Sequence, residues 1–126
     1  MGNRNLEISA ISSPLKTAFT ISRGAKTSAE TVRVTLSENG ATGRGESVPY
    51  ARYGETVDSV IAAIDSARSA LASGLSREDL QTLMPPGAAR CAVDCAMWDL
   101  EAKLAGKPVW QLAGLPEPKP VETAVT

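Results

Sequence analysis

Apolar and polar residues alternate in two stretches of the first half of the chain, a period of two that is typical of half-buried β-strands. The apolar residues of the first stretch are Leu6, Ile8 and Ala10. We predict that this strand ends near Ser13, where the alternation stops. Residues 15–28 show no periodic pattern and are predicted to form a long loop, a kind of segment that often carries function.

The second alternating stretch places its apolar residues at Val32, Val34 and Leu36. Asn39-Gly40 follows and is typical of a two-residue hairpin turn, because both residues accept a positive φ. The return strand, residues 41–48, carries Gly43 and Gly45 on one face, where bare glycine indicates a twist or a close backbone approach. The pattern therefore predicts three antiparallel strands, the first of them paired through the long loop.

Helical spacing replaces alternation in the second half of the chain. After a second loop at residues 49–54, Thr56 is predicted to cap a helix whose apolar positions recur at helical spacing as far as Gly74. Ser76, with an acidic residue three positions later, predicts a capping box for a short helix through Leu83. Both halves together predict an α+β fold, in which a three-stranded antiparallel sheet is followed by a helical bundle.

Residues 86–108 form the longest predicted helix. Good helix formers fill its interior, and Gly106 followed by Pro108 is a stop signal. At about 100° per residue, three of its charged residues fall within one narrow stripe: Arg90, Asp94 and Glu101. Nearly every other side is apolar, so we predict that neighbouring structure covers this helix on several sides.

The end of the chain changes character. Residues 109–115 predict one further helical turn, 116–120 are a stiff proline-rich linker, and 121–126 begin a strand. We therefore divide the chain into a folded domain, residues 1–115, and a linker with the start of a strand, residues 116–126. A strand without a successor leaves backbone groups unpaired. The expectation is that the sequence is the first domain of a longer protein.

The chain has 126 residues, of which 43% are hydrophobic and 21% charged, and these proportions are typical of a soluble globular domain. Its net charge of -1 gives no electrostatic reason to expect nucleic acid or an anionic membrane as a partner. No apolar run approaches the roughly 20 residues of a membrane span, and the polar start does not resemble a signal peptide. We therefore expect a cytoplasmic protein.

Histidine is absent and there are two cysteines. Without histidine, neither His-based triads nor the usual zinc sites can be completed. Cys91 and Cys95 lie one helical turn apart, and we interpret them as reduced core thiols, with a disulfide or half of a metal site as the alternatives. No phosphate loop, nucleophile elbow or metal-ligand cluster is found. We therefore assign no catalytic and no metal-binding residue to this chain.

Asp99 lies on a side of the longest predicted helix that should be covered by other residues. A buried carboxylate needs partners. We expect a structural hydrogen bond to a neighbouring loop, with an acid–base role as the alternative.

The two predicted loops hold the candidate substrate-binding residues. Those of the first loop are Phe19, Ile21, Arg23 and Lys26. Those of the second are Tyr50, Arg52 and Tyr53. The cations of the first loop would receive a substrate carboxylate, its apolar pair would close over the substrate, and the tyrosines would add a partly apolar wall. The alternative is ordinary solvated loop chemistry, with the apolar pair pinning the loop to the sheet.

Six short segments follow one another in an order that points to a known family. They are Arg23-Gly24-Ala25-Lys26, Gly43-Arg44-Gly45-Glu46, Pro49-Tyr50-Ala51-Arg52-Tyr53-Gly54-Glu55, Pro86-Gly87-Ala88-Ala89-Arg90, Asp94-Cys95-Ala96-Met97-Trp98-Asp99-Leu100 and Gly106-Lys107-Pro108. Together they resemble the N-terminal capping domain of the enolase superfamily. The resemblance is strongest for the muconate-lactonizing subgroup and, within it, for dipeptide epimerases of the L-Ala-D/L-Glu type.

This resemblance implies an α+β capping domain that closes over a modified (β/α) barrel, with two capping segments, here residues 19–26 and 48–53, that shape the substrate pocket. In dipeptide epimerases a basic residue of the first segment holds the acidic side chain of the substrate. Arg23 is the best positional match and Lys26 the alternate. The barrel supplies the two lysines that remove and return the α-proton and the three acidic ligands of Mg²⁺, none of them in this chain. Residues 121–126 match the first barrel strand.

The implied function is that of the capping domain of a Mg²⁺-dependent dipeptide epimerase, inactive as the isolated chain. The implied partners are its own C-terminal barrel and a small dipeptide, and the full-length enzyme is expected to be a homo-oligomer. Two alternatives stay open. One is another reaction on the same scaffold, namely cycloisomerisation, dehydration to o-succinylbenzoate or N-acylamino-acid racemisation. The other is a stand-alone α+β binding module with no enzyme attached.

Overall fold

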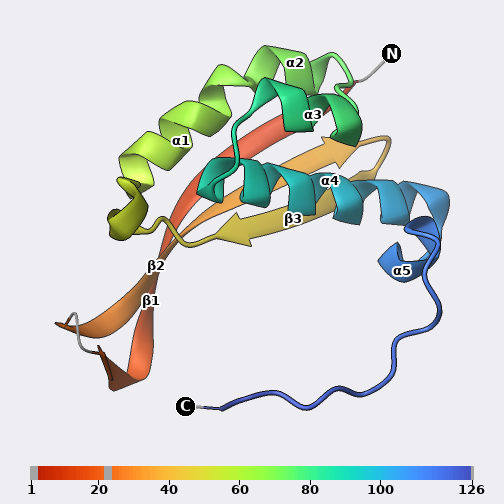
Figure 1. The fold of residues 1–126 in the computed structure, drawn as a ribbon. Helices are drawn as coiled ribbons and strands as arrows, with labels where there is room; N and C mark the ends of the chain where they lie inside the picture. Colours follow the sequence, from red (N-terminus) through yellow and green to blue (C-terminus); the bar gives the residue numbers. More distant parts are fainter. Residues whose placement is uncertain (1–2, 22–23, 126) are drawn as a thin grey trace.

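The computed structural model of the chain describes residues 3–21 and 24–125. Its strands form one antiparallel sheet in the order β1-β2-β3, with β1 at Asn5–Ile21, β2 at Gly24–Glu38 and β3 at Ala41–Ser47. The helices that follow are η1 (Ala51–Tyr53), α1 (Val57–Ser66), α2 (Arg68–Ala72), α3 (Arg77–Leu83), α4 (Ala88–Ala105) and α5 (Val109–Leu112). The predicted α+β fold, with a three-stranded sheet before the helices, is confirmed (Figure 1).

The predicted strand end near Ser13 and the predicted loop at residues 15–28 are both wrong, because β1 and β2 continue as a paired two-stranded ribbon. After a shift in register, the pairing resumes with Phe19 opposite Lys26. The outer half of this ribbon projects beyond the helices (Figure 1), and its side chains are largely exposed. With both faces in solvent, neither face requires apolar residues, so strand pairing leaves no alternation in the sequence.

The core lies between one face of the sheet and the helices. Val32, Val34 and Leu36 of β2 are fully buried, as the alternation predicts. On the helical side the buried residues come from every helix from α1 to α4, and the largest of them are Ile64, Leu71, Leu80, Met97 and Leu100. The opposite face of the sheet carries the polar partners of the alternation, including an exposed ion pair at 3.1 Å between Arg33 and Glu46. The molecule therefore has two layers with one hydrophobic core.

Helix α4 packs directly on β3, and two glycines make this possible. A Cβ added to Gly43 would lie 2.7 Å from the Cβ of Leu100, and one added to Gly45 would lie 2.7 Å from the main-chain nitrogen of Ala96. Main-chain atoms of α4 lie in contact distance of both positions. The close backbone approach predicted from the two glycines is therefore confirmed.

The outer surface of α4 differs from the prediction. The sheet covers the side that carries Ala92 and Ala96, but Cys91 and Cys95 are exposed in this chain. Both thiols are free, as expected, whereas their assignment to the core is wrong. Ala92, Ala96 and Leu100 occupy the side of the helix that meets the glycines of β3, and the two thiols lie on a different side.

The helix ends follow the expected capping chemistry, with one break that was not predicted. Thr56 caps α1 as predicted and forms a reciprocal capping box with Ser59. Of the capping box predicted at Ser76, the structure shows the hydrogen bond from the main-chain N–H of Asp79 to the Ser76 side chain. The single helix expected as far as Gly74 is divided at Ala67 into α1 and α2. Gly106 ends α4 in the left-handed conformation with φ of 66°.

Residues 116–125 contain no regular secondary structure, so the strand expected from residue 121 is not formed in this part of the described chain. Its assignment to a barrel strand stays a prediction. Among the described residues, no helix is both long and apolar enough to cross a membrane.

Asp99 ties α4 to β3. Its Oδ2 accepts a hydrogen bond from the main-chain N–H of Arg44 at 2.9 Å and another from Nζ of Lys103 at 2.9 Å. The expected structural hydrogen bond is confirmed, although its partner is a strand rather than a loop. Burial alone raises the pKa of Asp99, but these two hydrogen bonds and the nearby positive charges outweigh burial and hold the pKa below its usual value.

Asp99→Asn is expected to lower the free energy of unfolding at pH 7 by about 1 kcal/mol. Because the folded-state pKa of Asp99 is depressed, its contribution is present above the unfolded-state value of about 4 and is lost as the pH falls through the lower folded-state pKa. The difference between wild type and Asp99→Asn should therefore shrink as the pH falls below about 5 and through the lowered folded-state pKa. Urea unfolding across this range measures it, with Glu117→Gln in the linker as control. A difference that does not change with pH would contradict the assignment.

Candidate functional site

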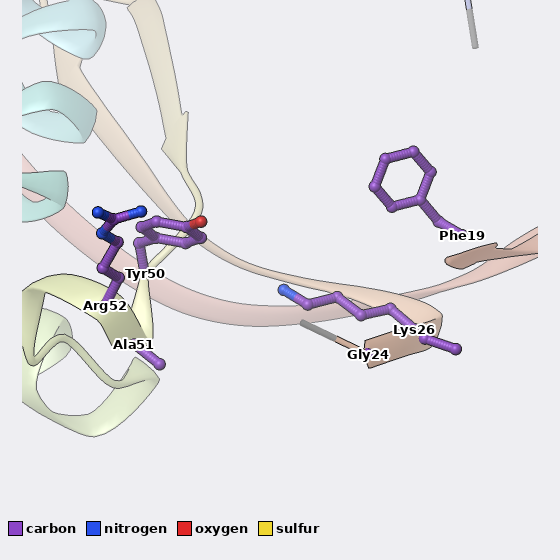
Figure 2. Close-up of a pocket in the computed structure, with 7 residues that line it drawn as sticks. Phe19, Gly24, Lys26, Tyr50, Ala51 and Arg52 are labelled. Atoms are coloured by element: carbon purple, nitrogen blue, oxygen red, sulfur yellow. The ribbon is translucent and has the colours of Figure 1, made fainter. Parts of the chain in front are cut away.

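The ribbon and the turn after β3 face each other across an open groove with a cavity volume of about 820 Å³. Seven of the described residues, from the two segments, line it: Phe19, Gly24, Ala25, Lys26, Tyr50, Ala51 and Arg52. Figure 2 shows the two walls, with the ribbon residues on one side and residues 50–54, here called the Tyr50 turn, on the other. Two segments that sequence analysis predicted to act together are thus brought together by the fold.

The ribbon wall combines one aromatic ring with one cation. Phe19 and Lys26 are directly opposite each other in the antiparallel register, so their side chains project from the same face of the ribbon. The Lys26 side chain extends toward Tyr50, and the ring of Phe19 stands apart from it above the ribbon (Figure 2). Phe19 is 46% exposed, a large apolar side chain available for contact with a ligand.

The opposite wall is a short 3₁₀ turn. Main-chain hydrogen bonds from Tyr53 to Tyr50 (3.0 Å) and from Gly54 to Ala51 (2.9 Å) close it, and Gly54 ends it with φ of 75°, a conformation that glycine adopts without strain. The rings of Tyr50 and Tyr53 are tilted by 59° at 5.3 Å between centroids. Tyr50 lines the groove, whereas Tyr53 lines an adjoining cavity and is 75% exposed.

The remaining predicted residues are described only in part. Arg23 lies outside the described residues. The main chain of Ile21 pairs with Gly24 at the end of β1, but the side chain of Ile21 is not among those that the structure describes. The roles predicted for these two residues stay predictions.

The groove is positive in character. Within the part of the chain that the structure describes, its lining includes the two cations Lys26 and Arg52 and no carboxylate. The rest of the lining is aromatic or small. A surface of this kind favours a ligand that has both a negative charge and an apolar part.

Glu55 was not predicted as a site residue, but its carboxylate contacts one wall of the groove. Its carboxylate accepts hydrogen bonds from the main-chain nitrogens of Tyr50 at 3.0 Å and Ala88 at 2.8 Å. Glu55 lies 33 residues before Ala88, so no local sequence pattern reports this contact.

The resemblance implies Mg²⁺, which carboxylate groups would hold. Across residues 3–21 and 24–125, no group of three or more Cys, Asp or Glu side chains is placed to hold a metal ion. The described residues thus do not fit a Mg²⁺ site.

Known proteins similar to this chain in sequence and in fold are dipeptide epimerases and their relatives. The chain is 48% identical over 113 residues to the L-Ala-D/L-Glu epimerase of Escherichia coli (strain K12), a match that covers 90% of this chain and 35% of the relative. An enolase family member from Agrobacterium tumefaciens, with homology to dipeptide epimerases and with bound sodium and L-Ala-L-Glu, is 47% identical with a TM-score of 0.86. That match covers 90% of this chain and 35% of the other.

A third similar protein is the dipeptide epimerase from Enterococcus faecalis V583, complexed with Mg and the dipeptide L-Leu-L-Tyr. It is 28% identical with a TM-score of 0.76, and the match covers 89% of this chain and 34% of the other. The chain spans about a third of the length of these relatives. The profile of the family described as "Mandelate racemase / muconate lactonizing enzyme, N-terminal domain" matches residues 4–114. The chain therefore belongs to the mandelate racemase / muconate lactonizing enzyme family, within the enolase superfamily, and corresponds to its N-terminal domain.

Proposed function

We propose that this chain is the capping domain of a Mg²⁺-dependent dipeptide epimerase that acts on dipeptides of the L-Ala-D/L-Glu type. The observation that carries the proposal is the groove in which the ribbon and the Tyr50 turn meet, with two cations and two aromatic rings in its lining. The similarity to an enolase family member with bound L-Ala-L-Glu supports it.

Within this proposal, the chain's own residues bind and orient the substrate. Lys26 and Arg23 attract the side-chain carboxylate of the terminal glutamate, and Phe19 and Tyr50 cover the apolar part of the dipeptide and exclude water. The proton-transferring lysines and the Mg²⁺ ligands belong to a C-terminal barrel outside the described residues. The groove therefore determines which dipeptide is held, and the barrel carries out the chemistry.

The full-length gene product is expected to exchange the α-proton of L-Ala-L-Glu for solvent deuterium in the presence of Mg²⁺, and the 126-residue chain alone is expected not to. The physical reason is that the described residues offer no Mg²⁺ site. Proton NMR in D₂O measures the exchange, with a panel of acidic and apolar dipeptides and N-acylamino acids as substrates.

Each outcome of this experiment has a definite meaning. Exchange catalysed by the 126-residue chain would contradict the division of labour between cap and barrel. A full-length enzyme that turns over N-acylamino acids but no dipeptide would replace the proposed substrate with an alternative on the same scaffold. A separate observation, the gene sequence, tests the other alternative: a stop immediately after codon 126 would favour a stand-alone module.

A further inference from the structure

Glu55 connects two parts of the molecule that are far apart in sequence. Its Oε1 accepts a hydrogen bond from the main-chain N–H of Tyr50 at 3.0 Å, and its Oε2 accepts one from Ala88 at 2.8 Å. Tyr50 lines the groove, and Ala88 is the first residue of α4. One half-buried carboxylate therefore ties a wall of the groove to the beginning of the longest helix.

The beginning of α4 explains why the carboxylate is held there. Gly87, the N-cap residue, has no side chain to accept a hydrogen bond, and the first turn of α4 has no acidic residue. The first N–H groups of a helix lack partners within the helix and carry partial positive charge. Glu55 supplies from a distant position both the acceptor and the negative charge that this end requires.

Glu55 makes two hydrogen bonds to Tyr50. Besides the contact from its carboxylate to the Tyr50 nitrogen, the main-chain N–H of Glu55 donates to the oxygen of Tyr50 at 3.2 Å. Both main-chain polar groups of Tyr50 are thus bonded to Glu55. Helix α4 is itself fixed, because its backbone packs on the glycines of β3. The bridge from Tyr50 through Glu55 to Ala88 therefore links the turn to a helix that is packed on the sheet.

We propose that Glu55 is a positioning residue that sets the width of the groove: it holds the Tyr50 turn at a fixed distance from the ribbon and thereby tunes substrate binding without touching the substrate. This inference rests on the proposed function, in which the groove receives the dipeptide. The reacting atoms would be held by the barrel, so the effect of Glu55 falls on binding rather than on the chemical step.

In the full-length enzyme, Glu55→Ala is expected to raise the KM for L-Ala-L-Glu roughly tenfold and to change kcat by less than about twofold. Glu55→Gln keeps one acceptor oxygen and should give a smaller increase in KM. Hydrogen exchange should show that the amides of Tyr50 and Ala88 lose protection together in Glu55→Ala, because both have lost the same acceptor.

The matched control is Ser76→Ala, which removes the side-chain cap of α3 and leaves the groove untouched. It should lower the melting temperature by an amount comparable to Glu55→Ala and keep the KM within about twofold of wild type. If the wild-type enzyme is active, two results would overturn the positioning role. One is a KM for Glu55→Ala equal to that of wild type, and the other is an equal rise in KM for Ser76→Ala. A wild-type enzyme with no turnover of any dipeptide would instead overturn the proposed function, so the two failures are distinguishable.

Discussion

Gly45→Val is expected to destabilise the folded chain strongly. A Cβ at this position would lie 2.7 Å from the main-chain nitrogen of Ala96 and in even closer contact with the main chain of Ala92. These atoms are helix backbone and cannot rotate away as a side chain would. The only relief is for α4 to move off β3, which would open the core where Met97 and Leu100 are buried.

The expected loss is at least about 3 kcal/mol, a large part of the roughly 5–15 kcal/mol that stabilises a typical domain. Urea unfolding followed by far-UV circular dichroism measures it. Arg44→Val is the matched control, because it places the same β-branched side chain one residue away on the exposed face of β3. A Gly45→Val protein with a wild-type midpoint would show that α4 does not pack on β3 as described.

This contact was predictable because it depends on a local feature. Two glycines spaced two apart in a strand leave one face of that strand bare, and a bare face permits close approach of another backbone. The expectation needed no knowledge of the partner. Similarly, Thr56 and Ser76 cap helices through contacts with residues three positions later, so a short stretch of sequence is enough to predict their roles.

The ribbon escaped prediction for the opposite reason. Residues 19–21 of β1 pair with residues 24–26 of β2, and main-chain pairing is indifferent to side-chain type when neither face is buried. The burial of Cys91 and Cys95 was predicted wrongly for a different reason. Their helix is apolar on most sides, but the part of the chain that the structure describes covers only some of those sides. A hydrophobic pattern indicates that a surface is to be covered, but not which segment covers it.

In the candidate site, too, some features could be predicted from local sequence and others depend on distant parts of the chain. Phe19, Lys26 and Tyr50 were predicted from residue type and from the resemblance, and the fold brings all three to one groove. That Tyr53 lines a different cavity depends on the pitch of one 3₁₀ turn, which spacing alone does not determine. The bridge made by Glu55 spans 33 residues and follows only from the folded structure.

The positive groove leads to the second large effect, which concerns substrate charge. In the full-length enzyme, Lys26→Met keeps the length of the side chain and removes its charge. We expect the KM for L-Ala-L-Glu to rise roughly 30- to 100-fold, because a substrate carboxylate would lose a charge-assisted partner in a groove that the proposed barrel covers. The KM for L-Ala-L-Leu should change by less than about threefold, since that substrate has no side-chain carboxylate to hold. Initial rates on the two dipeptides give the comparison.

Lys16→Met provides the matched control, because Lys16 is an exposed lysine on the same ribbon that does not line the groove. Arg23→Ala tests the neighbouring cation that the resemblance favours, and it should raise the KM for the acidic dipeptide far more than for the apolar one. Equal effects on both substrates would remove the altered residue from carboxylate binding and leave it only a general part in holding the ribbon. Selective effects of both substitutions would mean that two cations share the substrate carboxylate. The specificity of the enzyme for acidic dipeptides would then reside in a ribbon whose sequence shows no strand pattern.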